Sequence, residues 1–143
     1  MQNRLKNNLG FRGWIGGGRW GLDRYAYTLH RLSGLGLLAY FLMHIFVTGE
    51  RLGGPEQWET RMKFFDNPLF RFGEFLIFLA FAFHAVNGIR LIMVELGYML
   101  GKPGLSAYPY NYSTLRQKPL FMVVMVIAAV LMVIGGADLY LMR

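Results

Sequence analysis

Cysteine is absent from this chain of 143 residues. Its absence excludes disulfides, iron–sulfur ligation and thiol nucleophiles within the chain, and it leaves the redox compartment open. Acidic residues are also scarce, because only 8 Asp and Glu stand against 15 Lys and Arg. The sequence shows no paired carboxylates, no Ser/His/Asp arrangement and no nucleotide-binding motif. We therefore predict that no residue of this chain is itself catalytic.

Charged residues are missing from three long stretches, residues 32–49, 75–89 and 119–137. The third, PLFMVVMVIAAVLMVIGGA, lacks the polar stripe that a helix of a soluble bundle carries. A helix of about 20 mostly apolar residues spans the hydrocarbon core of a bilayer. The sequence therefore predicts an all-α membrane protein with transmembrane helices at about 23–48, 69–99 and 119–141.

The remaining segments are predicted as an arm and two connections. Residues 1–22 form an N-terminal arm, and residues 23–143 form the transmembrane domain. The glycine-rich stretch GWIGGGRWG in the arm follows no strand and precedes no GK[ST], which disfavours a phosphate-binding loop. In the first connection, PEQWETRMKFF predicts a short helix on the outer membrane surface. The second connection, GKPGLSAYPYNYS, is typical of a loop.

The net charge of +7 is unevenly distributed. Residues 1–31 and 101–118 are strongly basic, whereas residues 50–71 carry equal numbers of acids and bases. The positive-inside rule then places the N-terminus and the second connection in the cytoplasm, and the first connection and the C-terminus outside. We predict a multi-pass protein of a bacterial cytoplasmic membrane, in contact with lipid and with no nucleic-acid partner.

His84 lies in the middle of the second apolar run, LIFLAFAFHAVNGIRLIMVEL. Antiparallel hairpin geometry places it level with Gly36, near the bilayer midplane. Polar groups at such depth are costly and tend to mark function. The imidazole either hydrogen-bonds a neighbouring helix or acts as a neutral ligand of a metal or haem. Gly88, one turn further on, would let a flat macrocycle approach the backbone.

His44 occupies the outer third of the first helix, in YFLMHIFVTG. Its expected level is that of Leu76, which lies ~12 Å along the membrane normal from His84 at ~1.5 Å per residue. Both a hydrogen-bonded structural histidine and a second haem ligand fit this position.

The segment LHRLSG places His30, Arg31 and Ser33 near the cytoplasmic end of the first helix. These side chains suit the polar head group of a bilayer-soluble molecule, or they snorkel toward lipid phosphates. Arg90 and Glu95 return to the same level from the second helix. We expect them to join His30 and Arg31 in one polar cluster.

Two motifs carry a family resemblance, LHRLSG at 29–34 and FHAVNGIRLIMVELGY at 83–98. They resemble the cytochrome b556 membrane-anchor subunit of succinate dehydrogenase, respiratory complex II. That family has an HR-x-[ST]-G motif in its first helix and H-x-x-x-G-I-R, followed by an acid, in its second. The resemblance extends over about residues 20–140. Each motif alone is weak, but the pair in this order and separation is specific.

The resemblance implies that His84 is an axial ligand of haem b, in a helix bundle shared with a second membrane-anchor subunit that supplies the other ligand. His30, Arg31 and Arg90 would lie near the haem propionates. Arg31 and a nearby hydroxyl would bind ubiquinone or menaquinone, and the candidate hydroxyls are those of Tyr27, Thr28 and Ser33. Electrons would come from succinate through a flavoprotein and an iron–sulfur subunit. The chain would therefore belong to an enzyme without being catalytic alone.

The sequence also departs from the family pattern. Many members have a serine where this chain has Tyr27 or Thr28, a second histidine at the position of Leu91, and an aspartate at that of Glu95. His44 resembles the first-helix histidine of diheme relatives, so one haem or two are both compatible with the sequence.

Two alternative functions stay open at this level. The chain fits the haem b anchor of fumarate reductase, or of another membrane oxidoreductase such as a formate dehydrogenase or a hydrogenase. It also fits a haem-free small subunit of a transporter or assembly complex. In each case an obligate complex is expected, with close helix packing at the small residues Gly34, Gly36, Gly88, Gly135 and Gly136.

Overall fold

The computed structural model describes residues 22–98 and 118–141. Within these ranges the chain forms α2 (Leu22–Gly49), the 3₁₀ helix η1 (Glu50–Gly53), α3 (Pro55–Phe65), α4 (Pro68–Glu95) and α5 (Lys118–Leu141), and it contains no strand. The predicted arm up to residue 21 and most of the second connection lie outside the described residues. The predicted division into arm and domain stays a prediction.

Three segments of the described ranges are long and apolar enough to cross a membrane, Tyr25–Gly53, Pro68–Glu95 and Lys118–Leu141. They confirm the predicted all-α class with three membrane-spanning helices. The predicted short helix is α3, and it comprises the residues of PEQWETRMKFF. The protein is therefore an integral membrane protein.

Local chemistry explains where α3 and α4 begin. Each helix has a proline in its first turn, where the missing N–H would have no partner within the helix. The Asn67 side chain caps α4, because its Oδ1 accepts hydrogen bonds from the backbone N–H groups of Leu69 at 3.1 Å and Phe70 at 3.3 Å.

The end of α4 corrects the predicted range. The helix stops at Glu95, four residues before the predicted end at Met99. Gly97 adopts a φ of +86°, the N–H of Gly97 bonds the carbonyl of Val94, and the N–H of Tyr98 bonds that of Met93. These are the two hydrogen bonds of a Schellman motif, which ends a helix at a left-handed glycine. The apolar pattern continues past this point, so hydropathy alone overextended the helix.

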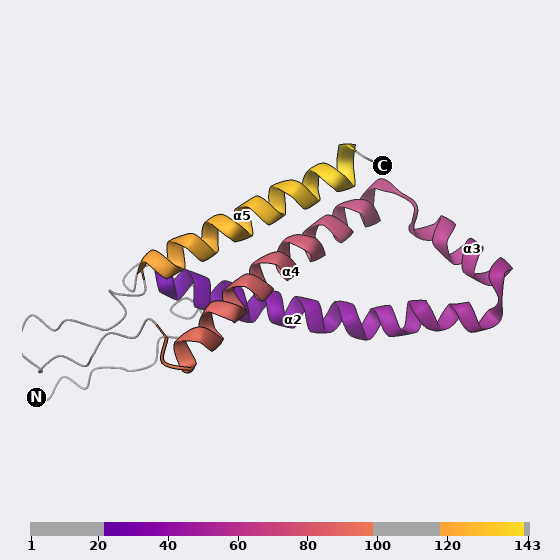
Figure 1. Cartoon of the computed structure of the whole chain (residues 1–143). Coiled ribbons are helices and arrows are strands. Elements are labelled where there is room, and N and C mark those ends of the chain that lie inside the picture. Colours follow the sequence, from indigo (N-terminus) through magenta and orange to yellow (C-terminus); the bar gives the residue numbers. More distant parts are fainter. Residues whose placement is uncertain (1–21, 99–117, 142–143) are drawn as a thin grey trace, which may run out of the picture.

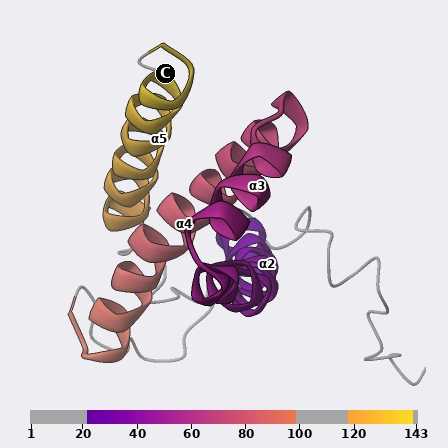
Figure 2. The same cartoon turned by 90° about the vertical axis from the view of Figure 1, so that its right-hand side faces the viewer.

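The three long helices form an open arrangement (Figures 1 and 2). α5 packs along α4, while α2 crosses α4 near the Leu22 end of α2 and diverges from it toward η1. Helix α3 bridges the open end between η1 and the start of α4 (Figure 1). The helices meet in a small core of Ala26, Phe83 and Phe121, which come from α2, α4 and α5. This core lies at the crossing and brings the polar side chains of α2 and α4 together.

Small residues allow close packing at some of the predicted positions. A Cβ on Gly135 would collide with the ring of Phe78, and one on Gly136 would lie 3.1 Å from the Phe75 ring. Gly34 is equally confined by the ring of His84. At Gly36, which is exposed, a Cβ would meet nothing within 4 Å of the chain, so close packing there against a partner helix stays a prediction.

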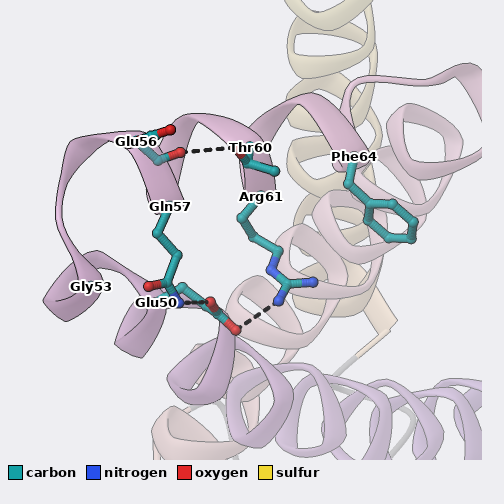
Figure 3. Close-up of a pocket in the computed structure, with 7 residues that line it drawn as sticks. All are labelled: Glu50, Gly53, Glu56, Gln57, Thr60, Arg61 and Phe64. Carbon is teal, nitrogen blue, oxygen red and sulfur yellow. Dashed lines mark hydrogen bonds and ion pairs between the residues drawn. The ribbon is translucent and has the colours of Figure 1, made fainter.

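A polar cluster ties α3 to η1, the short helix that follows α2. Glu50 accepts hydrogen bonds from the side chains of Gln57 and Arg61, and the Arg61 ion pair measures 2.8 Å (Figure 3). These residues surround a small open cavity that also reaches Phe64. The contacts hold α3 across the gap between the diverging helices.

Candidate functional site

The rings of His30 and His84 stack on each other where α2 and α4 cross. Their centroids are 3.9 Å apart and their planes differ by 4°. Both side chains are partly buried. Two of the predicted site residues therefore meet directly, one from each helix.

Two oxygen atoms of α2 surround the Nδ1 atom of His84. The His30 carbonyl oxygen lies 3.0 Å away and the Ser33 hydroxyl oxygen 3.1 Å away. The Ser33 hydroxyl also donates to the same carbonyl at 3.0 Å. A carbonyl oxygen only accepts, so its contact with His84 is a hydrogen bond only when Nδ1 carries the proton. A neutral imidazole in this arrangement leaves the lone pair of Nε2 available to a metal.

Glycine makes room for the His84 ring. A Cβ at Gly34 would lie 2.7 Å from Cε1 of His84, so any other residue would push the ring away. Gly88 is packed less tightly, with the Cε1 atom of His30 at 3.5 Å from a Cβ built there. The His84 ring is thus held by hydrogen bonds at one edge and by the α2 backbone along its side.

The level of His84 differs from the expected one. Hairpin geometry placed it opposite Gly36, but its contacts are with His30, Ser33 and Gly34. The estimate assumed parallel helix axes, whereas α2 and α4 cross and diverge (Figure 1). Counting residues back from the connecting loop therefore does not give the α2 residue that lies opposite His84 at the crossing.

The residues of the predicted cluster, His30, Arg31, Arg90 and Glu95, differ in how deeply their side chains are buried. Arg90 is buried, its Nε donates to Oδ1 of Asn87 at 3.1 Å, and its guanidinium lies 5.3 Å from the ring centre of Phe121 on α5. Arg31 and Glu95 are exposed. Two buried nitrogen atoms at this level, Nδ1 of His30 and Nδ2 of Asn87, have no hydrogen-bond partner among the described residues.

The four residues predicted to bind a quinone fall into two groups. Tyr27 and Arg31 are exposed and adjacent, since an Arg31 nitrogen donates to the Tyr27 hydroxyl at 3.0 Å and the guanidinium lies 5.4 Å from its ring centre. Thr28 is buried, and the Ser33 hydroxyl is directed to His84. The aromatic hydroxyl and the cation thus share one exposed face of α2.

His44 lies apart from this group, in the cleft that opens where α2 and α4 diverge. The cleft has a volume of about 770 Å³ and is mostly apolar, with residues of α2, η1, α3 and α4 in its walls. His44 is exposed and stacks on Tyr40 at 5.2 Å between ring centres. Leu76 lines the same cleft, as expected from its level, and Arg51 lines it with its guanidinium over the Trp58 ring.

These donors fit a haem better than a metal held by protein alone. In the part of the chain that the structure describes, no three His, Cys, Asp or Glu side chains gather around a common point. A haem iron requires only an axial side chain from the chain, and the contacts of His84 with α2 are made by Nδ1, which leaves Nε2 as the candidate ligand atom. The residues present therefore fit an axial haem ligand at His84.

Sequence reasoning missed three of these contacts. Ser33 was assigned to a quinone, although a serine three residues after a helical carbonyl commonly bonds back to it and so faces the same side. Tyr40 was not singled out, although its position one turn before His44 was a signal for the ring contact. No sequence signal indicated the stacking of His30 on His84, because it depends on the helix crossing.

Comparison with known proteins gives consistent matches. A family model described as "Succinate dehydrogenase/Fumarate reductase transmembrane subunit" matches residues 14–133. The chain is 30% identical over 95 residues to the "Succinate dehydrogenase hydrophobic membrane anchor subunit" of Halobacterium salinarum, covering 64% of this chain and 73% of the relative. It is 24% identical over 71 residues to the "Succinate dehydrogenase 2 membrane subunit SdhC" of Mycobacterium tuberculosis, covering 50% and 52% of the two chains.

Proposed function

Because the chain belongs to the family of succinate dehydrogenase and fumarate reductase transmembrane subunits, we propose that it is the haem b-binding anchor of such a complex. The relatives are subunits of an enzyme, and the chemistry on succinate is not carried out by this subunit. Its role is to hold the complex in the membrane and to help pass electrons to a quinone. The family match favours this function over a formate dehydrogenase anchor or a haem-free transporter subunit.

The observation that carries the proposal is the fixed imidazole of His84. Its Nδ1 proton is engaged by α2, so Nε2 is presented as a ligand in one tautomer. When bound, haem b would supply one-electron transfer at this level of the membrane. His30, Arg31 and Arg90 are the candidates for neutralising its propionates, because they come from the same end of the bundle.

Partner subunits complete the proposed site. All three long helices expose large apolar side chains, among them Phe46 at 79%, Val133 at 71% and Leu69 at 75% exposure. Such surfaces suit either lipid or the helices of a second anchor subunit, which would provide the other axial ligand. A flavoprotein and an iron–sulfur subunit would deliver the electrons from succinate, or receive them from quinol in a fumarate reductase.

Tyr27 and Arg31 are the proposed quinone-binding pair. The guanidinium and the phenol lie together on an exposed face of α2, and both can donate a hydrogen bond to a quinone carbonyl oxygen. Thr28 is buried and the Ser33 hydroxyl contacts His30 and His84, so we assign neither residue a direct contact with ubiquinone or menaquinone. Charge distribution supports an orientation with this end of α2 in the cytoplasm of a bacterial cell.

A second haem is proposed at His44, as a separate hypothesis. The cleft around His44 has the size of pockets that take small-molecule ligands and cofactors. Its wall contains the small residues Gly36, Ala39 and Gly73, and Arg51 provides a cation for an acidic group. His44 is accessible from this cleft, which supports a ligand role.

The test is a reduced-minus-oxidised spectrum of the purified complex, with pyridine-haemochrome quantitation per copy of the chain. Wild type, His84→Ala and His44→Ala are compared. We expect His84→Ala to lose about one haem per chain, since it removes an axial ligand. Loss of a further haem in His44→Ala would support the second site, and an unchanged content there would make His44 structural. Wild-type complex without haem would refute the proposed function.

A further inference from the structure

We propose that Ser33 is a positioning residue for the haem ligand, fixing the ring plane and tautomer of His84 together with the His30 carbonyl. This inference rests on the proposed function, because it concerns the imidazole that would ligate haem. It assigns Ser33 a role different from the quinone contact that its place in LHRLSG suggests.

Only one placement of the Ser33 hydroxyl proton and the His84 ring proton satisfies all three contacts. Ser33 Oγ donates to the His30 carbonyl at 3.0 Å, so its single proton is used. Nδ1 of His84, 3.1 Å from Ser33 Oγ and 3.0 Å from the carbonyl, then donates to both oxygens. In the other tautomer, the unprotonated Nδ1 and the carbonyl oxygen would face each other as two acceptors, which is unfavourable in a poorly solvated site.

Two acceptors hold the ring more firmly than one. With only the carbonyl, the imidazole can swing about its χ2 bond, which is a soft torsion for aromatic rings. The Ser33 oxygen is a second hydrogen-bond acceptor for Nδ1, and the α2 backbone at Gly34 packs against the side of the ring. The plane of His84 is therefore set by α2 and not by α4, which carries it.

The hydroxyl also influences the iron through the ligand. A hydrogen bond donated by the ring nitrogen that does not bind the metal raises the basicity of a ligating imidazole. This favours the oxidised metal. Removal of the Ser33 oxygen weakens this interaction. We therefore expect Ser33→Ala to raise the haem midpoint potential and to weaken haem binding about 10- to 100-fold.

The experiment compares wild type, Ser33→Ala, Ser33→Thr and Thr60→Ala as purified complexes. Potentiometric titration gives the haem midpoint potential, low-spin EPR reports the orientation of the axial ligands, and transfer of haem to an apo-globin measures its retention. Threonine keeps a hydroxyl that can bond a helical carbonyl. Thr60→Ala is the matched control, because it removes a hydroxyl that bonds back to Glu56 on α3, away from both histidines.

We expect Ser33→Ala to raise the potential, shift the EPR g values and release haem faster, with Ser33→Thr and Thr60→Ala close to wild type. A Ser33→Ala complex with wild-type potential, g values and retention would overturn the inference. If that variant does not assemble, Ser33→Cys, nearly isosteric but a weaker hydrogen-bonding group, must show the same upward shift in potential for the inference to stand. Failure of the proposed function is distinguishable, since the wild-type complex would then contain no haem, or His84→Ala would retain it.

Discussion

A histidine inside a membrane-spanning helix is costly unless each ring nitrogen has a use. At His84 one nitrogen is satisfied by the carbonyl of His30 and the hydroxyl of Ser33. The other has no hydrogen bond within the described residues, which suits a ligand but not a purely structural histidine. At residue scale the site thus consists of an imidazole and the α2 atoms that hold it.

Gly34 gives a test of this arrangement at the same scale. We expect Gly34→Ala to weaken haem binding about 10- to 100-fold, because the new Cβ would lie 2.7 Å from Cε1 of His84 and displace the ligand. Haem content per chain and its transfer to an apo-globin are the measurements.

The matched control for Gly34 is Gly49→Ala, at the end of the same helix, where a Cβ meets nothing within 4 Å. Alanine is the better helix former by about 1 kcal/mol, so helix propensity works in favour of both variants. If Gly34→Ala retains haem like Gly49→Ala, the backbone of α2 does not restrain His84.

At the scale of elements, helix ends decide which residues face the site. The cap at Asn67 fixes the start of α4, and the left-handed Gly97 follows its end. Local structure therefore determines which residues α4 contains. Only two residues separate the end of α3 from α4, which begins with Pro68. The short connection keeps α3 at the open end of the α2–α4 pair.

Asn67→Ala is expected to lower the free energy of unfolding by about 1 kcal/mol, because two N–H groups at the start of α4 lose their acceptor. Denaturant titration in mixed micelles measures the change. Asn67→Asp keeps the acceptor but loses the hydrogen bond from Nδ2 to the Phe64 carbonyl, so its stability should fall between wild type and Asn67→Ala. Equal stability of Asn67→Ala and wild type would contradict a capping role.

At the scale of the whole molecule, the divergence of α2 and α4 separates two environments. The crossing holds His30 and His84, and the open end holds His44 in an apolar cleft. If the axes of α2 and α4 had run side by side without diverging, the cleft would have been closed and His84 would have lain opposite Gly36. One chain thus presents imidazoles at both ends of one helix pair, which is the arrangement that the two-haem hypothesis requires.

The absence of native cysteine makes the predicted orientation directly testable. We expect Glu59→Cys, on exposed α3, to react with a membrane-impermeant maleimide in intact cells. Lys118→Cys, at the exposed start of α5, should react only after permeabilisation. The physical reason is the basic character of the N-terminal segment and the second connection. The reverse labelling pattern would invert the assigned topology and place Tyr27 and Arg31 on the outer side.

The sequence by itself determined the membrane-spanning class and the family, the latter through its two histidine motifs. It also predicted three of the four α-helices of the described residues to within a residue at each end. These features depend on local composition and spacing, which hydropathy and helix-end chemistry report directly. The misplaced end of α4 is instructive, because apolar residues continue past a glycine that turns the chain.

Only the tertiary structure decided which polar groups meet. The stacking of His30 on His84 and the contact of the Ser33 hydroxyl with Nδ1 of His84 both depend on the angle at which α2 and α4 cross. That angle results from packing Ala26, Phe83 and Phe121 between three helices, and from α3 holding the far ends apart. A periodic pattern along one helix contains no information about such an angle, because it is a property of the contact between helices.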